Sequence, residues 1–204
     1  MTDGEHAPSE WDSFAADWDT DAAARSYAAA AFGSLDLLLR GSGRSLDGAN
    51  VIDFGAGTGL LTERLVDAGA RVHAVDTSTA MLDVVRAKSD AHGWTDVHIS
   101  TDLPSDESGT DATDFDLVVC SSVCSFLDDY PGTVARLCQL LRPGGRFVQW
   151  DWERTAADEH GLSRTEIMSA LESAGLSEVS VDVGFEVAVE DDVMRPLMGQ
   201  GRVP

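Results

Sequence analysis

A glycine-rich segment and a later aspartate carry the clearest chemical signal in this chain of 204 residues. In "VIDFGAGTGLLTERL", a short apolar strand runs into the spacing G-x-G-x-G at Gly55, Gly57 and Gly59, and then into a helix. Glycines in such a turn let the backbone approach a ligand closely. Asp76 ends the next apolar strand, "RVHAV", where a carboxylate can accept hydrogen bonds from a ribose diol. The pattern therefore predicts a ligand that contains a nucleoside.

The details of the motif favour a cationic ligand over a pyrophosphate. Leu60 stands where the dinucleotide fingerprint G-x-G-x-x-G has its third glycine, and Asp53 lies two residues before Gly55. A dinucleotide places its pyrophosphate at the start of this helix, where an acidic residue would repel it. S-adenosylmethionine has no phosphate and carries an ammonium and a sulfonium, so it fits better. A nicotinamide-dependent oxidoreductase is the less favoured alternative.

Five segments in order resemble the class I S-adenosylmethionine-dependent methyltransferases, in particular their small-molecule type 11/type 12 group. They are "VIDFGAGTGLLT", "AVDTSTAML", "STDLP", "FDLVVCSSVCSFLDD" and "LLRPGGRFV". The likeness spans roughly residues 48–152 and continues more weakly to the C-terminus. It implies an α/β fold with a Rossmann-like, seven-stranded, mostly parallel sheet in the order 3-2-1-4-5-7-6 and helices on both faces. It also implies S-adenosylmethionine as the cofactor and methyl transfer to a small-molecule acceptor as the activity.

The resemblance also assigns cofactor-binding positions in this sequence. Those expected around the methionine end are Asp53, Gly55, Ala56, Gly57, Thr58, Gly59 and Ser121. Those expected around the ribose and adenine are Asp76, Thr77, Met81, Asp102 and Leu103. In this assignment Asp53 orients the glycine loop and Asp76 binds the ribose hydroxyls.

The acceptor is expected at the carboxyl ends of the fourth and fifth strands, beside the cofactor. We hypothesise that Asp151 orients the acceptor or takes its proton, and that Trp18, Phe126 and either Trp150 or Trp152 enclose it. In the alternative interpretation both tryptophans belong to the core and Asp151 is a solvated or helix-capping carboxylate. No other catalytic residue is predicted, because the cofactor already carries an activated methyl group.

The hydrophobic pattern predicts strands that alternate with helices, and hence a parallel sheet covered on both faces. Helices are expected over 21–40, 59–69, 78–91, 131–145 and 163–175, and strands over 51–54, 71–75, 96–100, 115–120, 146–152, 177–189 and 193–201. The last two strands are joined by a short acidic turn and must pair antiparallel. An acidic loop is expected over 104–114.

We expect a single methyltransferase domain over residues 1–204. Residues 1–47 would form an arm and a helix that act as a lid, 48–152 the cofactor-binding core, and 153–204 a C-terminal helix and antiparallel strand pair.

The charge balance excludes several classes of partner. The chain has 36 acidic and 14 basic residues, a formal net charge of −22, and Lys88 as its single lysine. Such a surface disfavours nucleic acid and anionic membranes, which bind basic patches. It favours a halophilic protein, because concentrated ions screen the self-repulsion of an acidic surface.

The remaining composition adds little chemistry. Cys120, Cys124 and Cys138 are expected to be reduced, buried thiols, and no histidines or cysteines have metal-ligand spacing, so no metal is predicted. The sequence has no long apolar run and no basic, apolar leader, which favours a cytoplasmic protein. It predicts neither the acceptor nor the oligomeric state. A non-catalytic protein that binds S-adenosylmethionine stays an alternative, because binding motif and catalytic geometry are separable.

Overall fold

A seven-stranded sheet in the order β3-β2-β1-β4-β5-β9-β6 organises the computed structural model, which describes residues 10–104, 114–154, 161–189 and 192–204. Its strands are β1 (Asn50–Phe54), β2 (Arg71–Val75), β3 (Val97–Ser100), β4 (Phe115–Ser121), β5 (Leu141–Asp151), β6 (Ser177–Val183) and β9 (Leu197–Arg202). Strands β1 to β5 are parallel, and β9 runs antiparallel to both of its neighbours. Counted within this sheet, the order is the predicted 3-2-1-4-5-7-6, which is confirmed.

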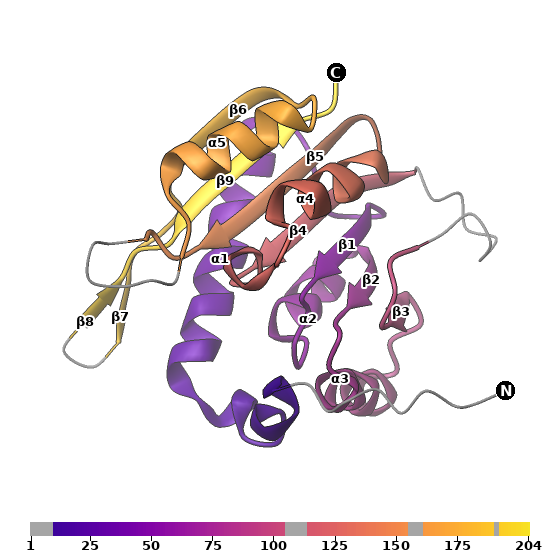
Figure 1. The fold of residues 1–204 in the computed structure, drawn as a ribbon. Helices are drawn as coiled ribbons and strands as arrows, with labels where there is room; N and C mark the ends of the chain where they lie inside the picture. The colour runs from indigo at the N-terminus through magenta and orange to yellow at the C-terminus, as the bar shows by residue number, and fades with distance from the viewer. Residues whose placement is uncertain (1–9, 105–113, 155–160, 190–191) are drawn as a thin grey trace, which may run out of the picture.

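Helices cover both faces of the sheet (Figure 1). They are α1 (Ala22–Gly41), α2 (Leu60–Asp67), α3 (Thr79–His92), α4 (Tyr130–Gln139) and α5 (Arg164–Ser173), with the short 3₁₀ helices η1 (Glu10–Phe14), η2 (Trp18–Thr20) and η4 (Cys124–Phe126). Figure 1 shows α4 and α5 on one face and α1 and α2 on the other. Helix α5 begins with a capping box, in which the side chains of Ser163 and Glu166 each accept a backbone N–H of the other residue.

Strand alternation divides the core into two layers. Val118 and Phe147 point toward α4 and α5, whereas Val119 and Val148, one residue along each strand, point toward α1 and α2. All four side chains are fully buried. The two central strands are therefore covered on both faces, as their continuous apolar runs predict.

Three predicted elements, one helix and two strands, differ from the observed ones. Helix α4 ends at Gln139 rather than at 145, and "RPGG" already belongs to β5, because Pro143 cannot donate a helical hydrogen bond. The strands predicted over 177–189 and 193–201 are each interrupted. Gly184 ends the first against the ring of Trp150, where a Cβ would lie only 2.8 Å from Cδ1. A separate hairpin, β7 (Val187–Val189) and β8 (Asp192–Met194), occupies the middle. Most of the predicted acidic loop, 105–113, lies outside the described residues.

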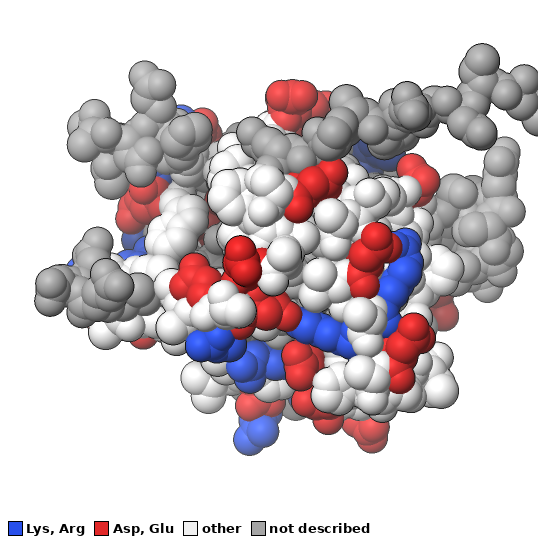
Figure 2. All heavy atoms as spheres, turned by 90° about the horizontal axis from the view of Figure 1, so that it is seen from below, with Lys and Arg blue, Asp and Glu red and all other residues white. Residues whose placement is uncertain are grey.

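Acidic side chains are spread over the face that is seen from below Figure 1, with basic groups between them (Figure 2). Within the described residues α3 takes part in three ion pairs: Arg86 binds Asp83 at 2.6 Å, and Lys88 binds Asp19 of η2 at 2.6 Å and Glu63 of α2 at 3.9 Å. The single lysine thus links η2 to α3. Exposed pairs of this kind contribute little to stability, so most of the acidic charge stays uncompensated.

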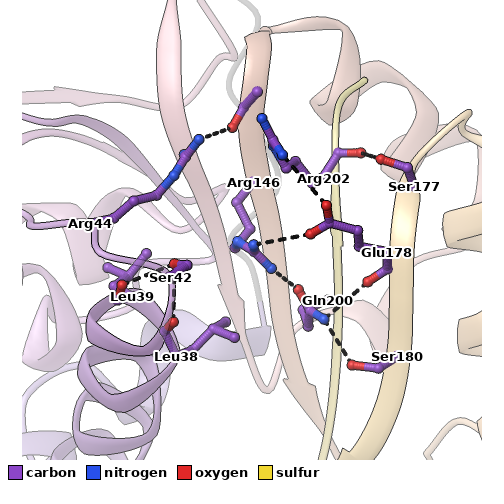
Figure 3. A network of polar contacts seen from close by, with 11 residues as sticks. Leu38, Leu39, Ser42, Arg44, Arg146, Ser177, Glu178, Ser180, Gln200 and Arg202 are labelled. Atoms are coloured by element: carbon purple, nitrogen blue, oxygen red, sulfur yellow. Dashed lines mark hydrogen bonds and ion pairs between the residues drawn. The ribbon is translucent and has the colours of Figure 1, made fainter.

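Polar contacts attach the C-terminal strands to the sheet (Figure 3). The buried guanidinium of Arg146 on β5 donates to the side-chain oxygen of Gln200 on β9. The amide nitrogen of Gln200 then donates to Ser180 Oγ of β6 at 2.8 Å. Arg202 forms an ion pair with Glu178 at 3.4 Å. This chain of contacts crosses three strands and fixes their register at the edge of the sheet.

The substitution Gly199→Ala tests how tightly α5 packs on β9. A Cβ at Gly199 would lie 2.3 Å from Ile167 Cγ2, so the helix must shift, and we expect the free energy of unfolding to fall by about 1–3 kcal/mol. Gly33→Ala is the control, because no atom lies within 4 Å of its Cβ position on the exposed side of α1. This change should raise the free energy by about 0.5–1 kcal/mol. Urea unfolding measures both, and equal effects would contradict the packing.

Candidate active site

A cavity of about 690 Å³ lies at the carboxyl ends of β1, β2 and β4. This volume is within the usual range for small-molecule sites, and the place is where open α/β sheets bind ligands. Of the positions predicted to bind a cofactor, those that line it are Asp53, Gly55, Ala56, Gly57, Thr58, Asp76, Thr77, Met81, Asp102, Leu103 and Ser121. Gly59 does not line it and instead occupies the N-cap of α2 in a left-handed conformation.

The glycine loop needs its glycines for their positive φ angles and, at Gly55, for lack of room. Gly55 has φ +73°, and a Cβ there would lie 2.5 Å from Val123 Cγ2 on the loop after β4. Gly57 has φ +54° and lines the cavity, and the position of its missing Cβ is open space. The loop therefore presents bare backbone to the cavity, which is how such loops cradle a ligand.

Asp76 connects the end of β2 to this loop. Its Oδ2 accepts the backbone N–H of Gly57 at 2.8 Å, and its Oδ1 accepts that of Ser78 at 2.8 Å. Burial raises the pKa of Asp76, and these two hydrogen bonds counteract that rise. Each carboxylate oxygen accepts more than one hydrogen bond, so a ribose diol can still bind to it.

Asp53 contributes a buried carboxylate whose hydrogen bonding is incomplete. The side chain is 1% exposed, and its Oδ2 accepts the hydroxyl of Thr62 at 2.6 Å. Its Oδ1 has no hydrogen-bond partner within the described part of the chain. Burial raises the pKa of Asp53 to about 6. An unpartnered carboxylate oxygen beside the cavity fits a cationic ligand group, so these residues suit S-adenosylmethionine.

The segment before α1 lies across the cavity. Trp11 and Trp18 line it, and the ring of Trp11 packs edge-on against that of Phe126, with 5.1 Å between the ring centroids. The hydroxyl of Ser78 donates to Asp12, and the hydroxyl of Thr58 donates to Asp19, so this segment is joined to the cofactor loops. A lid over this cavity remains a prediction.

Among the candidates for the acceptor pocket, Trp18, Phe126 and Trp152 line the cavity, whereas Trp150 and Asp151 do not. Trp150 is fully buried toward α1, and its Nε1 donates to Ser34 Oγ at 2.9 Å. Alternate residues of a strand share a face, so Trp152 lies on the same face as Trp150. Of these two tryptophans, Trp152 is the one that lines the cavity.

Asp151 is fully buried and holds the loop after β4. Its Oδ2 accepts the backbone N–H groups of Cys124, at 2.9 Å, and Ser125, at 3.3 Å, which begin η4. It therefore acts as the helix-capping carboxylate of the alternative interpretation. Burial raises its pKa, and these hydrogen bonds oppose the rise. The loop that carries Phe126 owes its position to this carboxylate.

The sequence reasoning missed several residues of the cavity, among them Tyr27 and Ser122. Tyr27 is one turn into α1, and an Ala-rich helix gives little indication of which face points inward. Ser122 has φ +55°, which is uncommon for a residue other than glycine and occurs often at functional sites. Residue type alone gives no signal for such a conformation.

Within the described ranges, no group of three or more His, Cys, Asp or Glu side chains is placed so that it could hold a metal ion. The three cysteines are buried and unpaired, as expected. None of the described helices is long and apolar enough to cross a membrane.

Comparison with known proteins points to one family. The family model of methyltransferase domains matches residues 52–147. Residues 52–147 thus resemble a methyltransferase domain, and similar proteins support the class I S-adenosylmethionine-dependent type. It is 35% identical over 113 residues to a ubiquinone biosynthesis O-methyltransferase of Aromatoleum aromaticum, a match that spans 55% of this chain and 47% of that relative. The chain thus spans about half the length of this curated relative.

Solved structures support the same fold for this domain. A Haloferax volcanii structure, a complex of the Trm112 methyltransferase activator with a putative methyltransferase, matches with a TM-score of 0.73 and 21% identity, covering 98% of this chain and 100% of that one. A Burkholderia thailandensis 1,6-didemethyltoxoflavin N1-methyltransferase, solved with 1,6-didemethyltoxoflavin and S-adenosylhomocysteine, matches with a TM-score of 0.67 and 22% identity, covering 100% of this chain and 93% of that one.

The pH dependence of stability tests the buried state of Asp53. Because its pKa in the folded protein is about 6, above its ordinary value of 3.8, the group favours folding below about pH 4. That contribution is lost as the pH rises through 6. We expect Asp53→Asn to be more stable than the wild type by about 1–3 kcal/mol at pH 7.5, at roughly 1.4 kcal/mol for each pKa unit. The difference should shrink toward pH 4.

Asp90→Asn is the control for this experiment, because it removes one negative charge from an exposed position on α3. Urea unfolding at several pH values measures both variants. A difference between wild type and Asp53→Asn that does not change with pH, or that Asp90→Asn reproduces, would contradict the buried carboxylate.

Proposed function

We propose that this chain transfers a methyl group from S-adenosylmethionine to a small-molecule acceptor. The observation that carries the proposal is that one cavity joins two different walls. One wall holds the glycine loop with Asp53 and Asp76, and the other holds aromatic side chains such as Trp152 and Phe126. The first wall can bind a nucleoside that carries a cationic amino acid, and the second wall can bind an apolar ring. Small-molecule acceptors in the names of similar proteins support the same proposal.

In this proposal the residues of the chain bind and align the cofactor and the acceptor, and the methyl group is activated by the cofactor itself. When bound, S-adenosylmethionine would supply a methyl group on a positively charged sulfur: the lone pair of the acceptor would form a bond to the methyl carbon, the C–S bond would break, and S-adenosylhomocysteine would leave. Asp76 binds the ribose hydroxyls, and Asp53 faces the ammonium with its unpartnered oxygen. The aromatic residues Trp11, Trp18 and Phe126 exclude water from the cavity. Such alignment and desolvation account for a large part of the catalysis of bimolecular reactions.

The charge of the cavity disfavours a nicotinamide-dependent oxidoreductase. Its lining includes the carboxylates of Asp21, Asp53, Asp76 and Asp102 but only one basic residue, Arg136. Leu60 occupies the place of the third fingerprint glycine and lines the cavity itself. A pyrophosphate would meet acidic groups where it needs donors and cations.

Acidity also suggests a saline environment, and we propose that the protein is adapted to high salt inside the cytoplasm. The net charge of −22 with one lysine supports this proposal. At molar salt the Debye length falls to about 3 Å, so the carboxylates no longer repel one another across the surface.

Cofactor selectivity tests the proposed binding site. S-adenosylhomocysteine should bind with a Kd of about 1 μM, or about −8 kcal/mol, and NAD should not bind measurably in isothermal titration calorimetry. Asp76→Ala should weaken binding by about 1–3 kcal/mol, because it removes a charged hydrogen-bond acceptor and frees the Gly57 amide. Binding of NAD without S-adenosylhomocysteine would overturn the proposal. Transfer of a labelled methyl group to an acceptor separates an enzyme from a non-catalytic binding protein.

Salt dependence tests the proposed adaptation. Between about 0.1 M and 2 M KCl the Debye length falls from about 10 Å to under 3 Å, so we expect the melting temperature to rise markedly. A homologous domain of near-zero net charge is the control, because salting-out of apolar surface raises its melting temperature too. A melting temperature that stays flat, or that rises no more than in the control, would contradict the adaptation.

A further inference from the structure

The aromatic wall of the cavity contains a tyrosine with a buried hydroxyl. Tyr27 of α1 is 8% exposed and lines the cavity. Its ring packs against Trp152, at 5.6 Å between centroids, and edge-on against Phe185, at 5.0 Å. These two contacts fix the orientation of the Tyr27 ring. The hydroxyl is buried and forms no hydrogen bond of ordinary length among the described residues; the one side chain that interacts with it as a hydrogen-bonding group is Ser122, which lines the same cavity.

A buried hydroxyl without an ordinary hydrogen bond is costly, so it calls for an explanation. The chain has two tyrosines, and the other one shows the ordinary arrangement. Tyr130 is buried away from the cavity, and its hydroxyl donates to Gln149 Oε1 at 2.7 Å. A purely structural role would be served equally well by phenylalanine at position 27. The hydroxyl of Tyr27 is therefore available to a ligand.

The surroundings of this hydroxyl point to the acceptor rather than the cofactor. Besides burial, the groups that influence its ionisation are Ser122, Asp151 and Cys124. Ser122 and Cys124 lie in the loop that follows β4, and Asp151 is the last residue of β5. The cofactor positions Asp53 and Asp76 end β1 and β2 instead. Burial raises the pKa of Tyr27, so the group stays a neutral hydroxyl that donates and accepts hydrogen bonds.

The same surroundings limit the chemistry of the ligand. Asp151 and the lining residue Asp21 are acidic, so an anionic group next to Tyr27 would be repelled. Flat apolar surfaces are provided by Trp18, Phe126 and Trp152, which line the same cavity. Aromatic rings pack favourably against such walls in tilted or edge-on arrangements.

We propose that Tyr27 is the acceptor-binding residue of this cavity and that the acceptor is a flat aromatic ring with an uncharged hydroxyl group. The ring lies between Trp152 and Phe126, and its hydroxyl forms a hydrogen bond with Tyr27. This inference rests on the proposed function, because it identifies the class of acceptor for the same site.

Binding of small probes to the full chain, saturated with S-adenosylhomocysteine, tests the proposal. Catechol is the probe, and its comparisons are veratrole, which lacks hydroxyl donors, cyclohexane-1,2-diol, which lacks the flat ring, and 3,4-dihydroxybenzoate, which adds a negative charge. Ligand-observed NMR titration should show catechol binding at least tenfold more tightly than each comparison. Tyr27→Phe should weaken catechol binding about tenfold, and Tyr130→Phe should leave it unchanged.

Thermal melting of the two variants separates binding from structure. Tyr27→Phe removes a buried hydroxyl without an ordinary hydrogen bond, so its melting temperature should equal or exceed that of the wild type. Tyr130→Phe leaves Gln149 Oε1 without its donor, so its melting temperature should fall.

Several outcomes would overturn the proposal. Catechol binding that Tyr27→Phe does not change, or an absence of catechol binding while S-adenosylhomocysteine binds, contradicts the acceptor class. A loss of S-adenosylhomocysteine affinity in Tyr27→Phe assigns the hydroxyl to the cofactor instead. If the wild type does not bind S-adenosylhomocysteine at all, the proposed function itself fails.

Discussion

The carboxylate of Asp76 holds together the part of the fold on which the site depends. One of its oxygens accepts the amide of Gly57, and the other accepts that of Ser78 at the start of α3. Through these two hydrogen bonds the end of β2 determines both the position of the glycine loop and the beginning of the next helix. The loop can reach Asp76 only because Gly55 and Gly57 have positive φ angles. The same carboxylate then forms the wall of the cavity.

A second buried carboxylate, Asp151, acts in the same manner on the other half of the cavity. It caps η4 and so positions Phe126, while β5 places Trp150 in the core and Trp152, after its end, at the cavity. The two halves thus share one feature, a carboxylate at the end of a strand that accepts backbone N–H groups of the loop after the neighbouring strand. Hydrogen bonds from backbone N–H groups to an ionised carboxylate are stronger than those between neutral groups, so they hold these loops in place.

The sequence predicted the parts of this architecture that depend on local pattern. The alternation of strands and helices indicates a parallel sheet covered on both faces, and the glycine spacing with Asp76 indicates the cofactor wall. The order of the strands was implied by the resemblance to class I methyltransferases. Features that depend on packing could not be predicted. Gly184 interrupts a long strand because the ring of Trp150 occupies the space above it, and the inward face of α1 is set by the packing of Tyr27 against Phe185. The role of Asp151 depends on which side of β5 it faces, which the strand direction alone does not reveal.

A crystal structure of the chain with S-adenosylhomocysteine tests the central claim most directly. The account predicts the ligand in the cavity at the ends of β1, β2 and β4, with its ribose hydroxyls on Asp76 and its ammonium facing Asp53 Oδ1. It also predicts that the sulfur faces the aromatic wall that contains Trp152. A ligand bound outside this cavity, or bound in it with the ribose away from Asp76, would contradict the account.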